Sequence, residues 1–404
     1  MKEGWEYKKL KDVATFTRGL TYSKNDEAEN SNNIVLRSNN VDLSTGKLNF
    51  EELKYLKPEF SIPEEKKVKK GSLLMCMSNG SKIHLGKVAL IDKDYPYAFG
   101  GFMALVTPNE KLNPRFFHYS LSSPEYKDFI KKLSAGANIN NIKVKELDLF
   151  IIPVPPLSEQ QSIVDYLDSA FAKIDTMKAN AEKSLNEAKA LFQASLKELL
   201  EPKEGWMEKM FGDVVVSNIV GLTRGKVEQG YDKKYPYFKM NNISPNNTLC
   251  WDDLICVDAN EEELEKYCLH EGDFLFNTRN SKEWVGKSTV YRDYDAPIML
   301  YNNNVMRIRF VDTINPVFVA YSFLADYTKN QLEKIKSGTT NVWAIYYRDL
   351  SKIFLTYPSL SEQHSIVTTL DSLKSKVDRL QENYDKISQE CDALKQAILR
   401  QVFE

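Results

Sequence analysis

The sequence predicts an α+β protein in which two globular domains stand at opposite ends of a long antiparallel two-helix coiled coil. Three observations predict this fold. The second half of the chain repeats the first, each half ends in a long segment with helical periodicity, and one of these segments carries an unbroken heptad stripe. The repeat makes the chain a pseudo-dimer with an internal pseudo-two-fold axis.

Matching motifs define the repeat. The stretch "GWEYKKLKDV" at Gly4 returns as "GWMEKMFGDV" at Gly205, and "PPLSEQQ" at Pro155 returns as "PSLSEQH" at Pro358. Because the order of the motifs is kept, a tandem duplication is indicated. We expect a globular domain over 1–155, a helix over 156–201, a second globular domain over 202–357 and a second helix over 358–404.

Each globular domain is predicted to mix short strands with turn-rich loops. In the first domain, β-type runs occur at Ile34–Leu36, Leu73–Met77, Val88–Ile91 and Phe150–Val154, and a helical patch at Arg115–Lys132. The long helices follow prolines, which cannot continue a strand ladder. Ser158 with Gln161 predicts a capping box for the first helix. Ser361 is the equivalent cap, but His364 replaces the glutamine, so we expect the second helix to start more weakly.

The heptad stripe of the second helix has gaps that alternate between three and four residues, which is typical of a coiled-coil seam. Subtracting the repeat offset gives the matching stripe of the first helix. The predicted seam consists of Leu167, Ile174, Met177, Leu191, Leu370, Leu373, Val377, Leu380, Ile387, Leu394 and Ile398. We expect Phe171, Leu185, Phe192 and Leu196 to lie beside it as surplus apolar surface. An amphipathic helix packed on an ordinary core remains the alternative.

Catalytic motifs are scarce. We find no phosphate-binding loop, no dinucleotide fingerprint and no zinc-protease or hydrolase motif, so the chain is not expected to be an enzyme. The scattered cysteines and the lack of a signal peptide suit a cytoplasmic protein. A zinc site from Cys250, Cys256, Cys268 and His270 is an alternative to buried thiols, although the spacing does not favour it.

The net charge of −2 neither establishes nor excludes a nucleic-acid partner. Only the first globular segment is basic, with 24 Lys and Arg against 19 Asp and Glu in residues 1–155. Readout of base edges depends on where Arg and Lys side chains point, so segment totals decide little.

The repeated "P-x-L-S-E-Q", the "W…K…DV" openings, and "KGSLL…GKVAL" with "EGDFLF…GKSTV" resemble the specificity subunit of type I restriction–modification systems over the whole chain. The resemblance implies two target recognition domains, each reading one half of a bipartite double-stranded DNA sequence. It also implies helices that set the spacer and dock two methyltransferase subunits, with restriction subunits in the full complex. No cofactor is expected in this chain, because S-adenosylmethionine, ATP and magnesium belong to the partner subunits.

The alignment places polar loops after a β-run in both halves, and these loops carry Asn, Ser, Lys and Arg, which suit base edges and phosphates. The candidate DNA-contacting residues are Asn79, Ser81, Lys82, Lys87, Asn138, Asn140, Arg279, Asn280, Lys282, Lys287, Asn341, Trp343 and Tyr346, with Arg18 and Arg224 of two "TRG" triplets. The alternative is structural: Gly86 and Gly286 with their lysines would shape a hairpin, and Trp343 would belong to the core.

A different class of function is also open. Two globular binding heads on a coiled-coil spacer would suit an adaptor that holds protein partners and no DNA. Against this reading, a generic spacer would not need matching sequence at both helix entrances.

Overall fold

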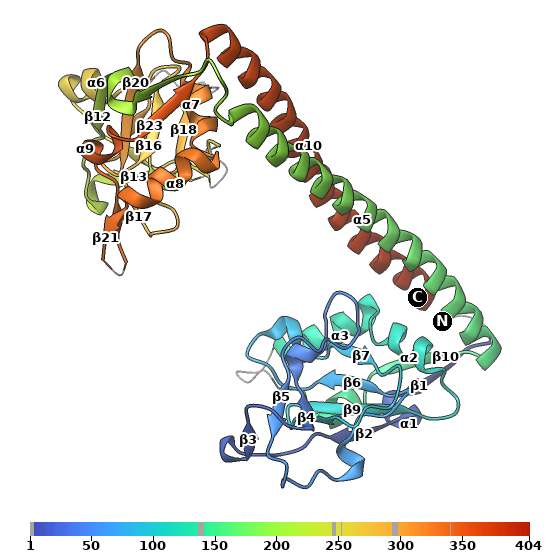
Figure 1. Cartoon of the computed structure of the whole chain (residues 1–404). Helices are drawn as coiled ribbons and strands as arrows, with labels where there is room; N and C mark the ends of the chain where they lie inside the picture. The colour runs from blue at the N-terminus through green and yellow to red at the C-terminus, as the bar shows by residue number, and fades with distance from the viewer. Residues whose placement is uncertain (1–3, 136–140, 245–247, 252, 293–297, 340) are drawn as a thin grey trace. The chain divides into compact units, whose positions relative to one another are not determined.

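The computed structural model describes the chain except for residues 1–3, 136–140, 245–247, 252, 293–297 and 340 (Figure 1). Its contacts divide the chain into two compact units. Unit 1 consists of Met1–Ala181 and Tyr384–Glu404, and unit 2 of Glu182–Asn383. Each unit therefore combines one globular domain with part of each long helix.

In unit 1, the strands form two four-stranded sheets, in the orders β2-β9-β6-β7 and β3-β5-β4-β8, and a separate pair β1-β10. The strands are β1 Glu6–Lys9, β2 Ala14–Arg18, β3 Glu27–Ala28, β4 Asn33–Leu36, β5 Lys54–Leu56, β6 Leu73–Cys76, β7 Val88–Leu90, β8 Ala98–Phe99, β9 Met103–Pro108 and β10 Ile151–Val154. The helices are α1 Leu10–Val13, α2 Pro114–Ser120, α3 Pro124–Ala135, α4 Val144–Leu147 and the start of α5 Leu157–Leu200.

Unit 2 repeats this topology with the sheets β12-β20-β16-β18 and β13-β15-β14-β19 and the pair β11-β23, and among its described residues it also has a small sheet β17-β22-β21. The strands are β11 Met207–Met210, β12 Val215–Val220, β13 Gln229–Gly230, β14 Tyr235–Phe238, β15 Cys256–Val257, β16 Phe274–Asn277, β17 Arg279–Asn280, β18 Ser288–Val290, β19 Leu300–Tyr301, β20 Val305–Phe310, β21 Ser337–Gly338, β22 Trp343–Ala344 and β23 Phe354–Tyr357. The helices are α6 Glu261–Tyr267, α7 Pro316–Ser322, α8 Asp326–Ile335, α9 Tyr347–Leu350 and α10 Leu360–Phe403.

The predicted α+β class and the predicted strands are confirmed. The four β-type runs of the first domain are β4, β6, β7 and β10. The helical patch is two helices, α2 and α3. Asn113 caps α2, since its side chain accepts from the Arg115 and Phe116 backbone N–H groups, and Pro114 occupies the first turn, where no N–H is needed.

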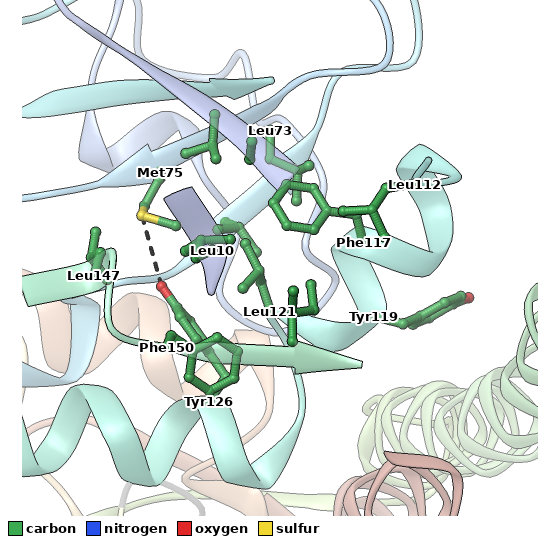
Figure 2. Packing of buried hydrophobic residues seen from close by; sticks show 14 of the residues in the cluster. Leu10, Leu73, Met75, Leu112, Phe117, Tyr119, Leu121, Tyr126, Leu147 and Phe150 are labelled. Atoms are coloured by element: carbon green, nitrogen blue, oxygen red, sulfur yellow. Dashed lines mark hydrogen bonds between the residues drawn. The ribbon is translucent and has the colours of Figure 1, made fainter. Parts of the chain in front are cut away.

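Strand β6 explains why an unbroken apolar run stands in the middle of each domain. Successive side chains of a strand point to opposite faces. Leu73 and Met75 join the core that reaches the long helices, while Leu74 and Cys76 join the core facing the other sheet. Figure 2 shows the first of these cores, in which the Tyr126 hydroxyl lies 3.7 Å from the Met75 sulfur. A strand buried on both faces must be apolar throughout.

The repeated Ser-Glu-Gln motif owes its glutamine to a buried set of three hydrogen bonds. Gln160 is fully buried; its Oε1 accepts from the Asn113 backbone N–H at 2.7 Å, and its Nε2 donates to the carbonyls of Lys111 and Pro155, both at 2.8 Å. Gln363 does the same in unit 2, with the backbone of Asn315, Thr313 and Pro358. We call this arrangement the glutamine latch. It ties the start of each long helix to the start of α2 or α7.

A second repeated contact lies two turns further along each long helix. In unit 1, Asp168 accepts from the Tyr119 hydroxyl at 2.5 Å and from Arg115 at 2.6 Å. In unit 2, Asp371 accepts from the Tyr321 hydroxyl at 2.6 Å and pairs with Arg292. Burial, together with the bonded carboxylate, raises the pKa of each tyrosine well above its ordinary value. The aspartates therefore fix each helix to its own domain.

The helix starts differ from the predicted caps. Leu157 is already helical, so Ser158 lies inside the first turn and does not cap it. In the second helix the capping hydroxyl belongs to Ser359, which accepts from the Glu362 N–H at 3.3 Å, and Ser361 lies inside the helix. Both predicted caps are wrong, and the second helix has a side-chain cap despite its His364.

Within each unit, α5 and α10 lie side by side in antiparallel directions (Figure 1). In unit 1, Cys391 contacts the Ile174 carbonyl at 3.7 Å and Lys178 pairs with Asp392 at 3.7 Å. In unit 2, Lys189 donates to Gln381 at 2.8 Å. The predicted seam positions that are buried or half-buried are Leu167, Ile174, Leu370, Leu373, Val377, Leu380, Ile387 and Ile398.

The predicted seam is wrong at three positions. Met177, Leu191 and Leu394 are 59, 56 and 47% exposed. The larger apolar side chains Phe171, Leu185 and Phe192 follow the predicted positions of α5 by one residue, and the buried face of the helix turns toward them. These residues and Leu196, expected as surplus surface, are instead buried or half-buried.

The glutamine latch predicts a large loss of stability on truncation. Gln363→Ala removes three hydrogen bonds and leaves the buried Asn315 N–H without its acceptor, so we expect the free energy of unfolding to fall by about 2–4 kcal/mol. Chemical denaturation would measure it. His364→Ala, at the exposed next position, is the matched control and should change little. Equal stability of the two variants would contradict the structural role of the latch.

Candidate nucleic-acid interface

The two candidate loop sets of unit 2 lie side by side. Strand β17 opens the loop 278–287 and pairs with β22, so that Arg279 faces Ala344 and Asn280 faces Trp343. Strand β21 closes this small sheet through Gly338 and Trp343. Figure 1 shows β17 and β21 at one edge of the unit. Loops about 60 residues apart in the sequence therefore form one surface.

Unit 1 has the same junction in the residues that the structure describes. Ser78 bridges Asn141, and the Ile142 N–H donates to the Met77 carbonyl at 2.8 Å, as the Ile345 N–H does to the Thr278 carbonyl in unit 2. Two predicted contact residues, Asn138 and Asn140, lie outside the described residues. The unit 2 counterpart of Asn138, Asn341, is exposed.

The exposed part of the unit 2 surface combines cations with aromatic rings. Arg279 and Lys282 are exposed, and the Lys282 Nζ lies 5.0 Å from the centre of the Trp343 ring. Trp343 also packs against the unit 2 core, as its structural alternative expected, and its contact with DNA stays a prediction. Tyr346 is 50% exposed. This surface can offer hydrogen-bond donors and a stacking face.

The two candidate asparagines shape their loops. Asn79 donates to the Ser38 hydroxyl at 2.7 Å, and its Oδ1 accepts from the Ser81 N–H at 2.9 Å. Asn280 donates to Asn277 at 3.1 Å and accepts from the Ser281 N–H at 2.9 Å. The exposed serines and lysines of these loops are Ser81, Lys82, Ser281 and Lys282.

The predicted contact roles of Lys87 and Lys287 are wrong. Each side chain is half-buried and turns inward: Lys87 donates to the Val41 carbonyl at 2.8 Å, and Lys287 donates to the carbonyls of Met240 and Ile243. Burial lowers the pKa of both ammonium groups. Gly86 and Gly286, with φ of 71° and 95°, make the turn that aims them inward, as the structural alternative expected.

Arg18 and Arg224 are not equivalent, although both stand in a "TRG" triplet. The structure aligns Gly19 with Gly221, because their N–H groups bond the carbonyls of Met103 and Val305, so Arg18 matches Val220. Arg224 is held by Glu263 at 2.6 Å and by two backbone carbonyls. These partners hold the Arg224 guanidinium against its own domain, so the structure favours a structural role for it. Arg18 is exposed.

Two exposed apolar side chains border the unit 1 loop and were missed in the sequence. Phe102 is 72% exposed and Ile83 is 69% exposed. Phe102 ends the stretch "FGGF" that begins at Phe99. The repeat could have revealed Phe102, because unit 2 has the polar residue Asn304 at the equivalent position.

Among the residues that the structure describes there is neither a candidate metal-binding cluster nor a candidate membrane-spanning helix. There, no three His, Cys, Asp or Glu side chains group closely enough to hold a metal ion, so the alternative zinc site is not formed. None of the described helices is long and apolar enough to cross a membrane.

A family model described as "Type I restriction modification DNA specificity domain" matches the chain twice, over residues 2–187 and 203–389. The chain belongs to this family. Each match covers one globular domain and most of the helix that follows it, so the two matches agree with the repeat that the sequence motifs define.

Known type I specificity subunits resemble the chain over its whole length. The EcoKI specificity subunit of Escherichia coli (strain K12) is 27% identical over 419 aligned residues, covering 100% of this chain and 89% of that protein. The StySPI specificity subunit of Salmonella potsdam is 26% identical, again covering 100% of this chain and 89% of that protein.

Solved structures share the fold. A chain from a structure described as "complex assembly and conformational transition of the type I R-M system" superposes with a TM-score of 0.75 at 20% identity, covering 100% of this chain and 98% of that one. The HsdS subunit from Thermoanaerobacter tengcongensis gives a TM-score of 0.57 at 20% identity, with 100 and 97% covered.

Because Lys87 is half-buried and Lys82 is exposed, replacing each of them by methionine should affect stability differently. Lys87→Met leaves the Val41 carbonyl without its donor, so we expect the free energy of unfolding to fall by about 1–2 kcal/mol. Lys82→Met, in the same loop but exposed, should leave stability unchanged. Denaturation of both variants would measure the difference. Equal stabilities would show that Lys87 is no structural lysine.

Proposed function

We propose that this chain is the DNA-recognition subunit of a type I restriction–modification complex, and that each unit reads one half of a two-part duplex target. The observation that carries the proposal is the doubled surface: the loop 78–87 beside Ile142 in unit 1, and the loop 278–287 beside 337–344 in unit 2. The backbone that holds the two loops repeats while the exposed side chains differ. This combination suits the recognition of two different half-site sequences.

The exposed residues have the chemistry that duplex recognition needs. Arg and Lys contact phosphates or guanine, and Ser and Asn contact base edges. The major groove also admits a two-stranded β-ribbon, and the hairpin of β21 and β22 in unit 2 has that form. We assign phosphate and base contacts to Arg279, Lys282 and Asn341 in unit 2, and to Ser81 and Lys82 in unit 1.

The proposed role of the helices is to set the spacer between the half-sites and to dock methyltransferase subunits. Exposed apolar residues recur at equivalent positions of the two halves: Leu191 and Leu394, Ile151 and Phe354, and Leu157 and Leu360. Apolar surface that is repeated with the chain suits two copies of one partner. Restriction subunits would complete the assembly.

In this proposal the chain itself is non-catalytic. S-adenosylmethionine, ATP and magnesium would be bound by the partner subunits, which would carry out methyl transfer and cleavage. The chain's own contribution is to hold the duplex in register.

Exchange of one domain tests the division of labour. Replacing residues 206–357 by the equivalent segment of another type I specificity subunit should change one half of the methylated target and leave the other half intact. Sequencing the methylated sites of the assembled enzyme would measure it. A change in both halves, or in neither, would contradict the proposal that each unit reads its own half-site.

The number of partner copies tests the docking proposal. Mass measurement of the co-purified complex should give two methyltransferase subunits per chain, and methylation should need both. Leu191→Lys combined with Leu394→Lys should weaken assembly, because both substitutions put a charge into the proposed docking surface. Saturation with one copy, or methylation by the chain alone, would contradict this part of the account.

A further inference from the structure

Phe102 is an exposed ring on a fixed backbone. It lies in the turn between β8 and β9, and its carbonyl accepts from the N–H groups of Met77 at 2.9 Å and Ser78 at 3.2 Å. These bonds anchor it at the base of the loop that carries Ser81, Lys82 and Ile83. Because the backbone is held and the side chain is 72% exposed, the ring is presented to whatever approaches this loop.

The fold of the domain does not require an apolar residue at the position of Phe102. In unit 2 the equivalent carbonyl belongs to Asn304, which accepts from the Thr278 N–H at 2.8 Å, and the strands beside it pair in the same register. Ile83 shows the same contrast. Counting back from the equivalent glycines Gly86 and Gly286, its counterpart is the exposed Glu283. Unit 1 therefore has two exposed apolar residues where its sister unit has polar ones.

The charge around these residues suits nucleic acid. From Cys76 to Ile91 the charged side chains are Lys82 and Lys87, with His84 as a further base, and residues 95–107 carry no charge. Arg37 is also near: a Cβ on Gly100 would lie 3.8 Å from its Cγ. Apolar side chains beside the exposed Lys82 and near Arg37, in two segments that themselves carry no carboxylate, complement a duplex, whose grooves lie between phosphates.

We propose that Phe102 and Ile83 are specificity-determining residues of unit 1 that contact thymine methyl groups in the major groove. Thymine alone among the unmodified bases presents a C5-methyl group there, and apolar side chains recognise it by contact. This inference rests on the proposed function of the chain. It assigns an A·T preference to at least one position of the half-site that unit 1 reads.

The test uses the assembled methyltransferase complex and duplexes that carry its methylated target. Each thymine of both half-sites is replaced in turn by deoxyuridine, which lacks only the methyl group. We expect one or two replacements to weaken binding about three- to fivefold each, the effect of one buried methyl group. They should fall in the half-site that is retained when residues 206–357 are exchanged.

The variants Phe102→Asn and Ile83→Glu carry the residues of the sister unit, so the frame accommodates them. Each should bind the thymine duplex more weakly than the parent and lose its sensitivity to the corresponding deoxyuridine. Val227→Asn is the control, since Val227 is 94% exposed and belongs to unit 2. Thermal unfolding of all variants should match the parent.

Several results would overturn the inference. The first is a half-site of unit 1 without thymine on either strand. The second is a deoxyuridine effect that persists in both variants. The third is a variant that loses methyltransferase subunits, since Phe102 or Ile83 would then contact protein and not DNA. Failure of the proposed function looks different: the complex would then show no preference for any DNA sequence.

Discussion

The buried amide of Gln160, repeated at Gln363, is the interaction on which the arrangement of each unit depends. Its three hydrogen bonds join the last strand, the cap of α2 or α7 and the first turn of a long helix. Only a side chain that both accepts and donates can serve these groups. The Tyr–Asp–Arg contact, with Arg115 in one unit and Arg292 in the other, fixes the same helix two turns later. Each globular domain, which carries the candidate DNA-contacting loops, is thus joined to its long helix by two separate sets of side-chain hydrogen bonds.

The frame and the reading surface obey different constraints. Strands β6 and β16 are buried on both faces, so their side chains are set by packing. The loops that follow them end at a glycine with positive φ and an inward lysine in both units, yet the exposed residues between differ: Ile83 stands in the unit 1 loop, and Arg279 and Lys282 stand in the unit 2 loop. A fixed frame with variable tips lets one fold recognise two different sequences.

The sequence predicted the repeat, the strands and the long helices well, because periodicity and motif order depend on local chemistry. It could not show where a polar side chain points. Lys87 and Lys287 look like DNA contacts, but their direction follows from a turn and from carbonyls more than 40 residues away. The "TRG" triplets match by letter and not by position, since the strand register aligns Arg18 with Val220 and not with Arg224. The seam was misplaced by one residue at Met177 and Leu191, because 3.6 residues per turn leave neighbouring stripes nearly equivalent until packing selects one.

The central claim is that one chain reads two separate half-sites on the same duplex. Base-resolved sequencing of methylated adenines in the host genome tests it most directly, with a strain lacking this chain as the control. The account predicts one motif with two specified halves separated by an unspecified middle of constant length, which disappears in the control strain. A continuous motif, a motif with one specified half, or a pattern that survives loss of the chain would contradict it.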